Sequence, residues 1–263
     1  MKNYFESNKI LWDKRAALHV DSDFYDMKSF REGASSLKPI ELDLLGDIKG
    51  KSILHLQCHF GQDSLSMARM GAKVTGLDIS ETAIEQARNI NEELGLDATF
   101  VCANVLDTNA VIKEEFDIVF LSYGAICWLP DLQPWAEIIA SRLKAGGQLI
   151  MAEFHPVLYM YDWDSNDIAY HYFNDGKPYV EVEENSYAAT DKEINAVEYF
   201  WVHPLSDIIQ QLIRAGLTIN TFKEFDYSPY HCFSNLEERA PGEYTYNLTK
   251  YRFPHVFSIK ATK

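Results

Sequence analysis

The sequence is short of cysteine and of positive charge. Its four cysteines, Cys58, Cys102, Cys127 and Cys232, all lie more than four residues apart, so it has no CxxC motif for zinc or redox chemistry. Because 24 Lys and Arg face 39 Asp and Glu, the net charge is −15, which argues against nucleic acids and anionic membranes as partners. No secretion-like segment begins the chain, and the longest uncharged apolar run, 118–130, is too short to cross a bilayer. We expect a cytoplasmic protein.

Short apolar runs alternate with helical patterns over the middle of the chain. Five runs are apolar at nearly every position, which predicts strands covered on both faces: 52–56, 73–78, 98–102, 116–121 and 148–154. Helices are predicted between them, over 81–94 after the N-cap residue Ser80 and over 132–143 before the glycine pair 146–147. This alternation predicts right-handed βαβ units and therefore a doubly wound α/β fold with a mostly parallel sheet.

Two segments fall outside this pattern. Residues 1–50 have a mostly helical pattern and are predicted to form an N-terminal helical cap on a domain of residues 51–263. Residues 161–200 hold ten acidic and two basic residues, and we expect an antiparallel insertion, or lid, over one end of the sheet. Within it, the turn 174–176 predicts a hairpin between 170–173 and 179–182. After it we expect a helix closed by Gly216, a strand through Phe225, and a last strand at 254–260.

The turn after the first predicted strand and the end of the second carry a distinctive pattern. They read His55-Leu-Gln57-Cys58-His59-Phe-Gly61-Gln-Asp63 and Gly71-Ala-Lys-Val-Thr-Gly-Leu-Asp78-Ile-Ser80. This pattern resembles the first two motifs of class I S-adenosylmethionine-dependent methyltransferases, and the resemblance extends over essentially the whole chain. It implies seven strands in the order 3-2-1-4-5-7-6 with the seventh antiparallel. It also implies S-adenosylmethionine as the cofactor and S-adenosylhomocysteine as the product.

The first motif departs from the family's usual (D/E)xGxGxG pattern. His55, Gln57 and His59 stand at the acidic position and at the first two glycine positions, and Gly61 is the remaining glycine. The run LQCHFGxD also resembles a bacterial subgroup of methyltransferase-like proteins. We therefore interpret this loop as a variant cofactor loop; the rival interpretation is a degenerate loop that binds nothing.

Candidate cofactor residues follow the strands, because ligands of open parallel sheets bind beyond the carboxyl ends. Asp78 is expected to accept hydrogen bonds from the ribose hydroxyls, although it could instead cap a helix. Asn104 stands where the family contacts adenine, although it could instead be a turn residue. Ile79 and Val105 are expected to flank the adenine ring. The full set is Gln57, Cys58, His59, Gly61, Asp63, Asp78, Ile79, Ala103, Asn104, Val105, Leu121, Ser122 and Tyr123.

Other ligands of this fold lack their motifs. GxGxxG is absent after the first strand, which argues against a dinucleotide. The chain has Ser-Tyr-Gly-Ala where amino-methylating DNA methyltransferases carry (D/N)PP(Y/F), and it has no Pro-Cys pair for a cytosine-C5 enzyme. The acceptor is therefore predicted to be a small molecule. A cofactor-binding protein without transferase activity, such as a sensor or interaction module, and an oxidoreductase of Rossmann type remain as alternatives.

The residues of the acceptor side carry fewer signals. His155 follows the fifth strand and is the candidate general base, because imidazole titrates near neutrality; it could equally be a strand-end residue. The candidate acceptor pocket consists of Tyr25, Trp128, Tyr230 and His231, which could equally be core rings. We expect no metal, and a monomer or a homodimer.

Overall fold

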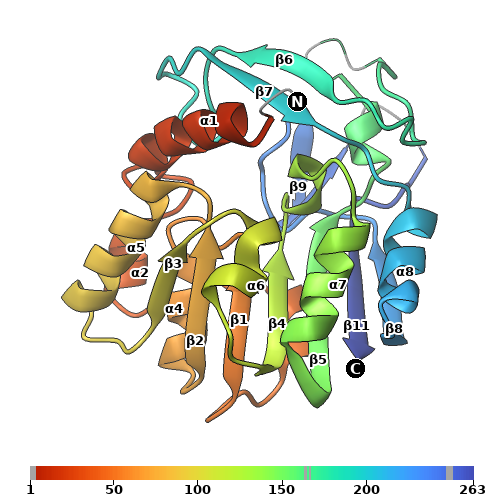
Figure 1. The fold of residues 1–263 in the computed structure, drawn as a ribbon. Coiled ribbons are helices and arrows are strands. Elements are labelled where there is room, and N and C mark those ends of the chain that lie inside the picture. The colour runs from red at the N-terminus through yellow and green to blue at the C-terminus, as the bar shows by residue number, and fades with distance from the viewer. Residues whose placement is uncertain (1–3, 163–164, 166, 247–250) are drawn as a thin grey trace.

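A seven-stranded sheet runs through the computed structural model, which describes residues 4–162, 165, 167–246 and 251–263 (Figure 1). Its order is β3-β2-β1-β4-β5-β11-β8. The first five strands are parallel neighbours, and β11 is antiparallel to both β5 and β8, as the sequence predicted. The strands are β1 (Ser52–Leu56), β2 (Lys73–Asp78), β3 (Thr99–Cys102), β4 (Phe116–Ser122), β5 (Leu143–Phe154), β8 (Thr218–Phe225) and β11 (Val256–Thr262).

Helices cover both faces of the sheet because successive strand residues alternate between two apolar clusters. On one face, Leu54 and Val119 pack with Trp135 of α7 (Gln133–Arg142) and Leu212 of α8 (Leu205–Arg214). The other face packs against α3 (Pro39–Leu45) and α4 (Gln62–Arg69). A third cluster joins α4 to α5 (Glu81–Glu93) and α2 (Met27–Arg31). The short α6 (Thr108–Val111) follows β3.

The N-terminal helix and the insertion lie together above the carboxyl ends of the strands (Figure 1). Helix α1 (Tyr4–His19) docks on β7 (Ala196–Phe200), where Asn8 exchanges two hydrogen bonds of 2.8 and 2.9 Å with the backbone of Tyr199. Strand β6 (Tyr179–Glu183) pairs antiparallel with β7. These elements therefore form a roof over the edge of the sheet where ligands of this fold bind.

The predicted hairpin at 174–176 is wrong. Asn174 does form a local turn, since its Oδ1 accepts the N–H of Gly176 at 2.7 Å, but β6 pairs with β7 and not with 170–173. The ring of Tyr170 packs instead on Tyr179 and Phe200. The turn signal is local and does not specify the strand partner, which lies on β7, about fifteen to twenty residues further along the chain.

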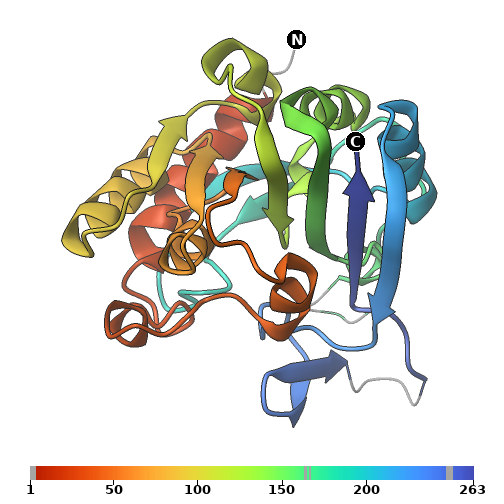
Figure 2. The same cartoon turned by 90° about the horizontal axis from the view of Figure 1, so that it is seen from below.

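Three further elements differ from the prediction or were not predicted. Strand β5 starts at Leu143, directly after α7, so the glycine pair 146–147 lies within a strand. Helix α4 was not predicted. A hairpin of β9 (Leu236–Ala240) and β10 (Glu243–Tyr246) projects on the side of α2 and α3 (Figure 2). In the described part of the chain, no helix combines the length and the apolar character needed to span a bilayer.

Candidate functional site

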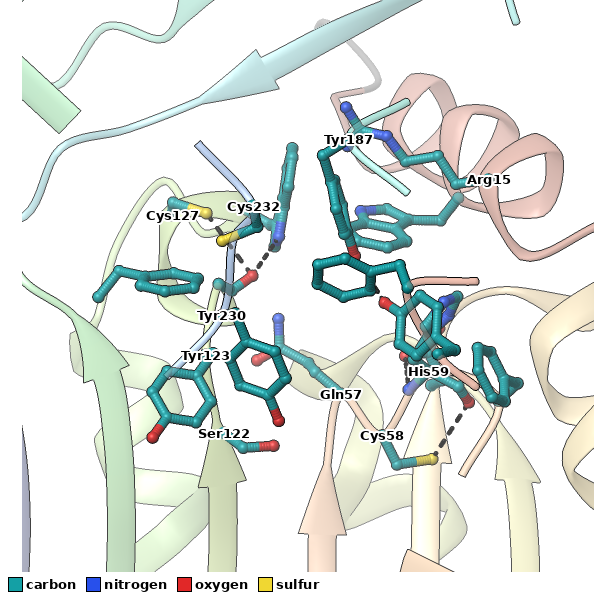
Figure 3. Close-up of a pocket in the computed structure, with 18 of the residues that line it drawn as sticks. Arg15, Gln57, Cys58, His59, Ser122, Tyr123, Cys127, Tyr187, Tyr230 and Cys232 are labelled. Atoms are coloured by element: carbon teal, nitrogen blue, oxygen red, sulfur yellow. Dashed lines mark hydrogen bonds between the residues drawn. The ribbon is translucent and has the colours of Figure 1, made fainter. Parts of the chain in front are cut away.

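A cavity of about 1050 Å³ lies between the roof and the carboxyl ends of the strands. Figure 3 shows Arg15 and Tyr187 on its upper side and Gln57, His59 and Ser122 at the strand ends below. The cavity brings together most of the residues predicted for the site. The predicted residues that line it are Tyr25, Gln57, Cys58, His59, Gly61, Asp63, Asp78, Ile79, Asn104, Val105, Ser122, Tyr123, Trp128 and Tyr230.

Four predicted residues do not line this cavity. Leu121 is buried within β4, and Ala103 lies beside the cavity without lining it. His231 is turned away, with its Nε2 bonded to the carbonyl of Leu236 at 2.8 Å. His155 is buried against β8, where its Nε2 lies 3.0 Å from Glu224 and its Nδ1 accepts the N–H of Val157 at 3.2 Å. Both ring nitrogens of His155 are therefore occupied away from the cavity, which contradicts its prediction as the general base.

The loop after β1 keeps a glycine-type backbone although two glycines are replaced. Gln57, His59 and Gly61 have φ values of 55°, 51° and 78°. This left-handed region costs a non-glycine residue on the order of 1–3 kcal/mol, so other contacts must hold it. Gln57 Nε2 donates to the carbonyl of Ala125 at 2.7 Å, and the N–H of Gly61 donates to the carbonyl of Cys58 at 2.9 Å. The loop therefore adopts the backbone conformation that glycines normally permit, although Gln57 and His59 carry side chains.

Asp78 ends β2 directly beside that loop. Its Oδ2 accepts the backbone N–H of His59 at 2.8 Å, and its Oδ1 accepts that of Ser80 at 2.9 Å. Burial raises the pKa of Asp78 to about 6, although these hydrogen bonds oppose the rise. Each carboxylate oxygen has a second lone pair, and the residue lines the cavity, so Asp78 can still accept ligand hydroxyls. The cap of α5 comes from Ser80, whose Oγ accepts the N–H of Ala83.

The residues that follow β2 and β3 bring two apolar side chains and one amide to the carboxyl edge of the sheet. Ile79 and Val105 both line the cavity. Asn104 also lines it, but its Oδ1 accepts the N–H of Leu106 at 2.9 Å and caps a short 3-10 helix. The turn role of Asn104 is therefore present in the structure, and its amide NH₂ faces no hydrogen-bond partner in the described chain.

A hydrogen-bonded group of residues forms the wall after β4. Ser122 donates to Asp63 at 2.9 Å, and Tyr123, with φ 25°, donates its hydroxyl to Glu41 at 2.9 Å. Burial, with the charge of Asp63 added, raises the pKa of Glu41 to about 8. Glu41 lies in no recognisable motif, so its role here could not be predicted from the sequence.

Glu153 fixes the chain that follows this wall. Its buried carboxylate accepts the N–H groups of Gly124, Ala125, Ile126 and Phe154, the second at 2.8 Å and the last at 2.7 Å. Burial raises its pKa, and the four N–H donors oppose that rise. Trp128 then donates its indole N–H to the carbonyl of Gly124 at 2.5 Å. Glu153 therefore positions the loop that presents Trp128 to the cavity, a role that sequence reasoning missed.

Helix α1 closes the cavity over the loop through aromatic and histidine contacts. Trp12 packs edge-on against His59, with ring centroids 5.3 Å apart. His19 Nδ1 lies 2.9 Å from His59 Nε2, and its Nε2 lies 2.6 Å from Ser186 Oγ. Burial lowers the pKa of His19 to about 2 and that of His59 to about 3, so this pair is neutral and one ring donates to the other. Asp13 also accepts Ser80 Oγ–H at 2.6 Å.

Carboxylates of the roof face the same cavity. Glu181, Glu183 and Glu198 have oxygen atoms within 4.8 Å of one another, a spacing that a metal ion could bridge. The guanidinium of Arg15 already contacts two of them, Glu183 at 3.0 Å and Glu198 at 3.1 Å. A cation is therefore already present at this group in the form of Arg15.

The sheet order and the loop after β1 define a Rossmann-like methyltransferase fold. Residues 53–147 match a family model described as a methyltransferase domain. The chain is 20% identical to a putative S-adenosylmethionine-dependent methyltransferase of Listeria monocytogenes, whose structure superposes with a TM-score of 0.60 over 85% of this chain and 97% of that one.

Curated relatives support the same class. The chain is 27% identical to the ubiquinone biosynthesis O-methyltransferase of Proteus mirabilis over 157 residues, which cover 53% of this chain and 64% of that protein. It is 29% identical to the uncharacterized methyltransferase YbaJ of Bacillus subtilis over 189 residues, which cover 72% and 74%. The match thus spans less than two thirds of the Proteus protein, and these similarities support the methyltransferase class that the sequence predicted.

Proposed function

We propose that this chain is an S-adenosylmethionine-dependent methyltransferase that acts on a small-molecule acceptor. The observation that carries the proposal is the loop after β1, in which Gln57 and His59 keep left-handed backbone angles and His59 is tied to Asp78. Strained backbone held by its surroundings is typical of ligand-binding sites. We further propose that LQCHFGxD is a working variant of the first motif and not a degenerate remnant.

The polar groups around the cavity fit this cofactor. Gln57 Oε1, His59 Nδ1 and His55 Nε2 are buried and have no hydrogen-bond partner among the described residues, and all three side chains line the cavity. Buried polar atoms without partners are costly unless a ligand satisfies them. A ligand with ribose hydroxyls, an ammonium group and a carboxylate offers the donors and acceptors that these atoms lack.

Each part of the cofactor has a proposed set of residues. Asp78 would accept the ribose hydroxyls, Ile79 and Val105 would flank the adenine, and the amide of Asn104 would face its edge. Ser122 and Tyr123 would lie beside the methionine arm. When bound, S-adenosylmethionine supplies a methyl group that is already electrophilic, so the chain must chiefly align an acceptor with it.

Alignment and exclusion of water are proposed as the main contributions of this chain to the reaction. Correct placement of two reactants can supply about 7–11 kcal/mol of the barrier reduction. Trp128 is fixed through the loop that Glu153 holds, and Tyr25 and Tyr230 face the cavity from other segments. Since His155 lies outside the cavity, we assign no histidine base.

The roofed cavity and the net charge of −15 favour a small acceptor over a nucleic acid. With four free cysteines, we propose a reducing compartment such as the cytoplasm.

A methyl-transfer screen tests this function directly. The full chain is incubated with S-adenosylmethionine labelled in its methyl group and with fractionated small-molecule extracts, and label in new products is counted. We expect labelled product with the parent protein and at least tenfold less with Asp78→Asn. Cofactor binding without transfer to any fraction would favour the alternative, a binding protein without transferase activity.

A further inference from the structure

The two-stranded sheet of the roof has an inverted side-chain pattern. Val180, Val182 and Val197 are exposed, with Val182 67% exposed, whereas three of the six alternate positions carry glutamates that line the cavity: Glu181, Glu183 and Glu198. The register places Glu181 directly opposite Glu198. Like charges opposite one another destabilise a strand pair, and a sequence that breaks local folding rules in this way is typical of a functional site.

One guanidinium contacts two of these carboxylates, Glu183 and Glu198. Arg15 Nη2 contacts one oxygen each of Glu183 and Glu198, and its guanidinium lies 5.2 and 5.7 Å from the ring centroids of Trp12 and Trp128. The second oxygens of Glu183 and Glu198 have no hydrogen-bond donor in the described part of the chain. Glu183 and Glu198 therefore share one contacting guanidinium and keep free acceptor capacity toward the cavity.

A buried donor at the same place also lacks a partner. Arg15 is 5% exposed, and its Nε–H has no hydrogen-bond acceptor among the described residues. Burial, together with the charges of Glu183 and Glu181, raises the pKa of Glu198 to about 7 against the lowering effect of Arg15. The free oxygens of Glu183 and Glu198 need a donor, best a cationic one, and the Nε–H of Arg15 needs an acceptor, so the site would be completed by a ligand that brings both.

We propose that Glu183 and Glu198 bind a protonated amine of the methyl acceptor, an inference that rests on the proposed function. Aromatic side chains beside them, Tyr170, Tyr187 and Phe200, line the same cavity and provide faces for the apolar body of such a molecule and for its cation. Carboxylates keep the amine protonated and so remove its lone pair. The amine is therefore an anchor, and the methyl group goes to a different atom of the acceptor.

The proposed amine anchor is tested with aromatic probes that share one ring system and differ in carrying a positive charge, no charge or a negative charge. Binding to the full chain is measured by isothermal titration, with and without saturating S-adenosylhomocysteine, for tyramine, 4-ethylphenol and 4-hydroxyphenylacetate. Tryptamine, 3-ethylindole and indole-3-acetate form a second set. We expect each amine to bind about tenfold or more tightly than its neutral analogue, since hydrogen bonds to charged groups contribute that much, and each acid to bind weakest.

Variants then assign the preference to the two glutamates. Glu183→Gln and Glu198→Gln should each reduce the preference for the amine about tenfold, while Glu193→Gln, which removes the same charge from an exposed position of the insertion outside the cavity, should leave it unchanged. Equal binding of amine and neutral probe, no binding of either amine, or an equal effect of Glu193→Gln would overturn the anchor. Failure of S-adenosylhomocysteine itself to bind would instead contradict the proposed function.

Discussion

The backbone N–H of His59 lies 2.8 Å from Oδ2 of Asp78, which ties the loop after β1 to the end of β2. The loop and the carboxylate are thus one unit in the fold. A ligand that binds the carboxylate also meets the left-handed backbone of the loop.

Replacing Asp78 with asparagine should weaken S-adenosylhomocysteine binding about 10- to 100-fold, because a charged acceptor of hydroxyl groups is lost. Asparagine keeps an oxygen for only one of the two N–H groups, a loss of about 1–3 kcal/mol that should leave the fold intact. Isothermal titration gives the affinity and circular dichroism the fold. Asp97→Asn, at an exposed position before β3, is the control and should bind as the parent does. Parent-like affinity in Asp78→Asn would place the ribose elsewhere.

Because the backbone at Gln57 is left-handed, we expect a glycine variant at this position to be more stable than an alanine variant. Gln57→Gly and Gln57→Ala both lose the hydrogen bond to Ala125, but only alanine keeps the strain at φ 55°. Urea unfolding should therefore show the glycine variant more stable than the alanine variant by about 0.5–1 kcal/mol. At exposed Glu85 within α5 the same pair should show the opposite order, with alanine more stable by about 1 kcal/mol. Alanine ahead of glycine at position 57 would contradict the loop geometry.

Glu153→Gln tests the loop that carries Trp128. The variant loses a charged acceptor of four N–H groups and puts an NH₂ group among those donors, so the free energy of unfolding should fall by about 2–3 kcal/mol. Urea unfolding measures the loss, and exposed Glu92→Gln should change stability by less than about 0.5 kcal/mol. A parent-like stability of Glu153→Gln would show that this carboxylate does not hold the loop.

Stability should fall in acid because of His55. Burial lowers its pKa to about 4, whereas in the unfolded chain it is about 6.5. Below pH 6.5 the imidazole of His55 is therefore protonated in the unfolded state but not in the folded state. The free energy of unfolding falls as the pH is lowered toward 4. Between pH 7 and pH 5, His55→Gln should lose about 2 kcal/mol less of its unfolding free energy than the parent. Equal losses would show that His55 is not held neutral by the fold.

The sheet and the cofactor side were predictable because their signals are local. Apolar runs marked the strands, and the position of Asp78 at a strand end placed it on the ligand edge. His155 shows the limit of that rule. It also follows a strand, but β5 is flanked by β11, and the side chain reaches Glu224 on β8 and not the cavity.

The sequence predicted an antiparallel insertion over the sheet but not the contacts of the roof, because those contacts join distant segments. Arg15 meets glutamates 168 and 183 residues further along the chain. His19 contacts His59 across 40 residues; His59 belongs to the motif after β1, but no pattern around His19 indicates that the two rings meet. Such contacts depend on where α1 docks, and the amphipathic pattern of one helix does not specify its neighbour.

Cofactor binding by the parent protein tests whether the cavity is a site for S-adenosylmethionine. Isothermal titration of the full chain with S-adenosylhomocysteine, S-adenosylmethionine and NAD compares the ligands that this fold accepts. We expect saturable binding of the first two with one molecule per chain and no measurable binding of NAD. Binding of NAD without any response to S-adenosylhomocysteine would contradict this expectation.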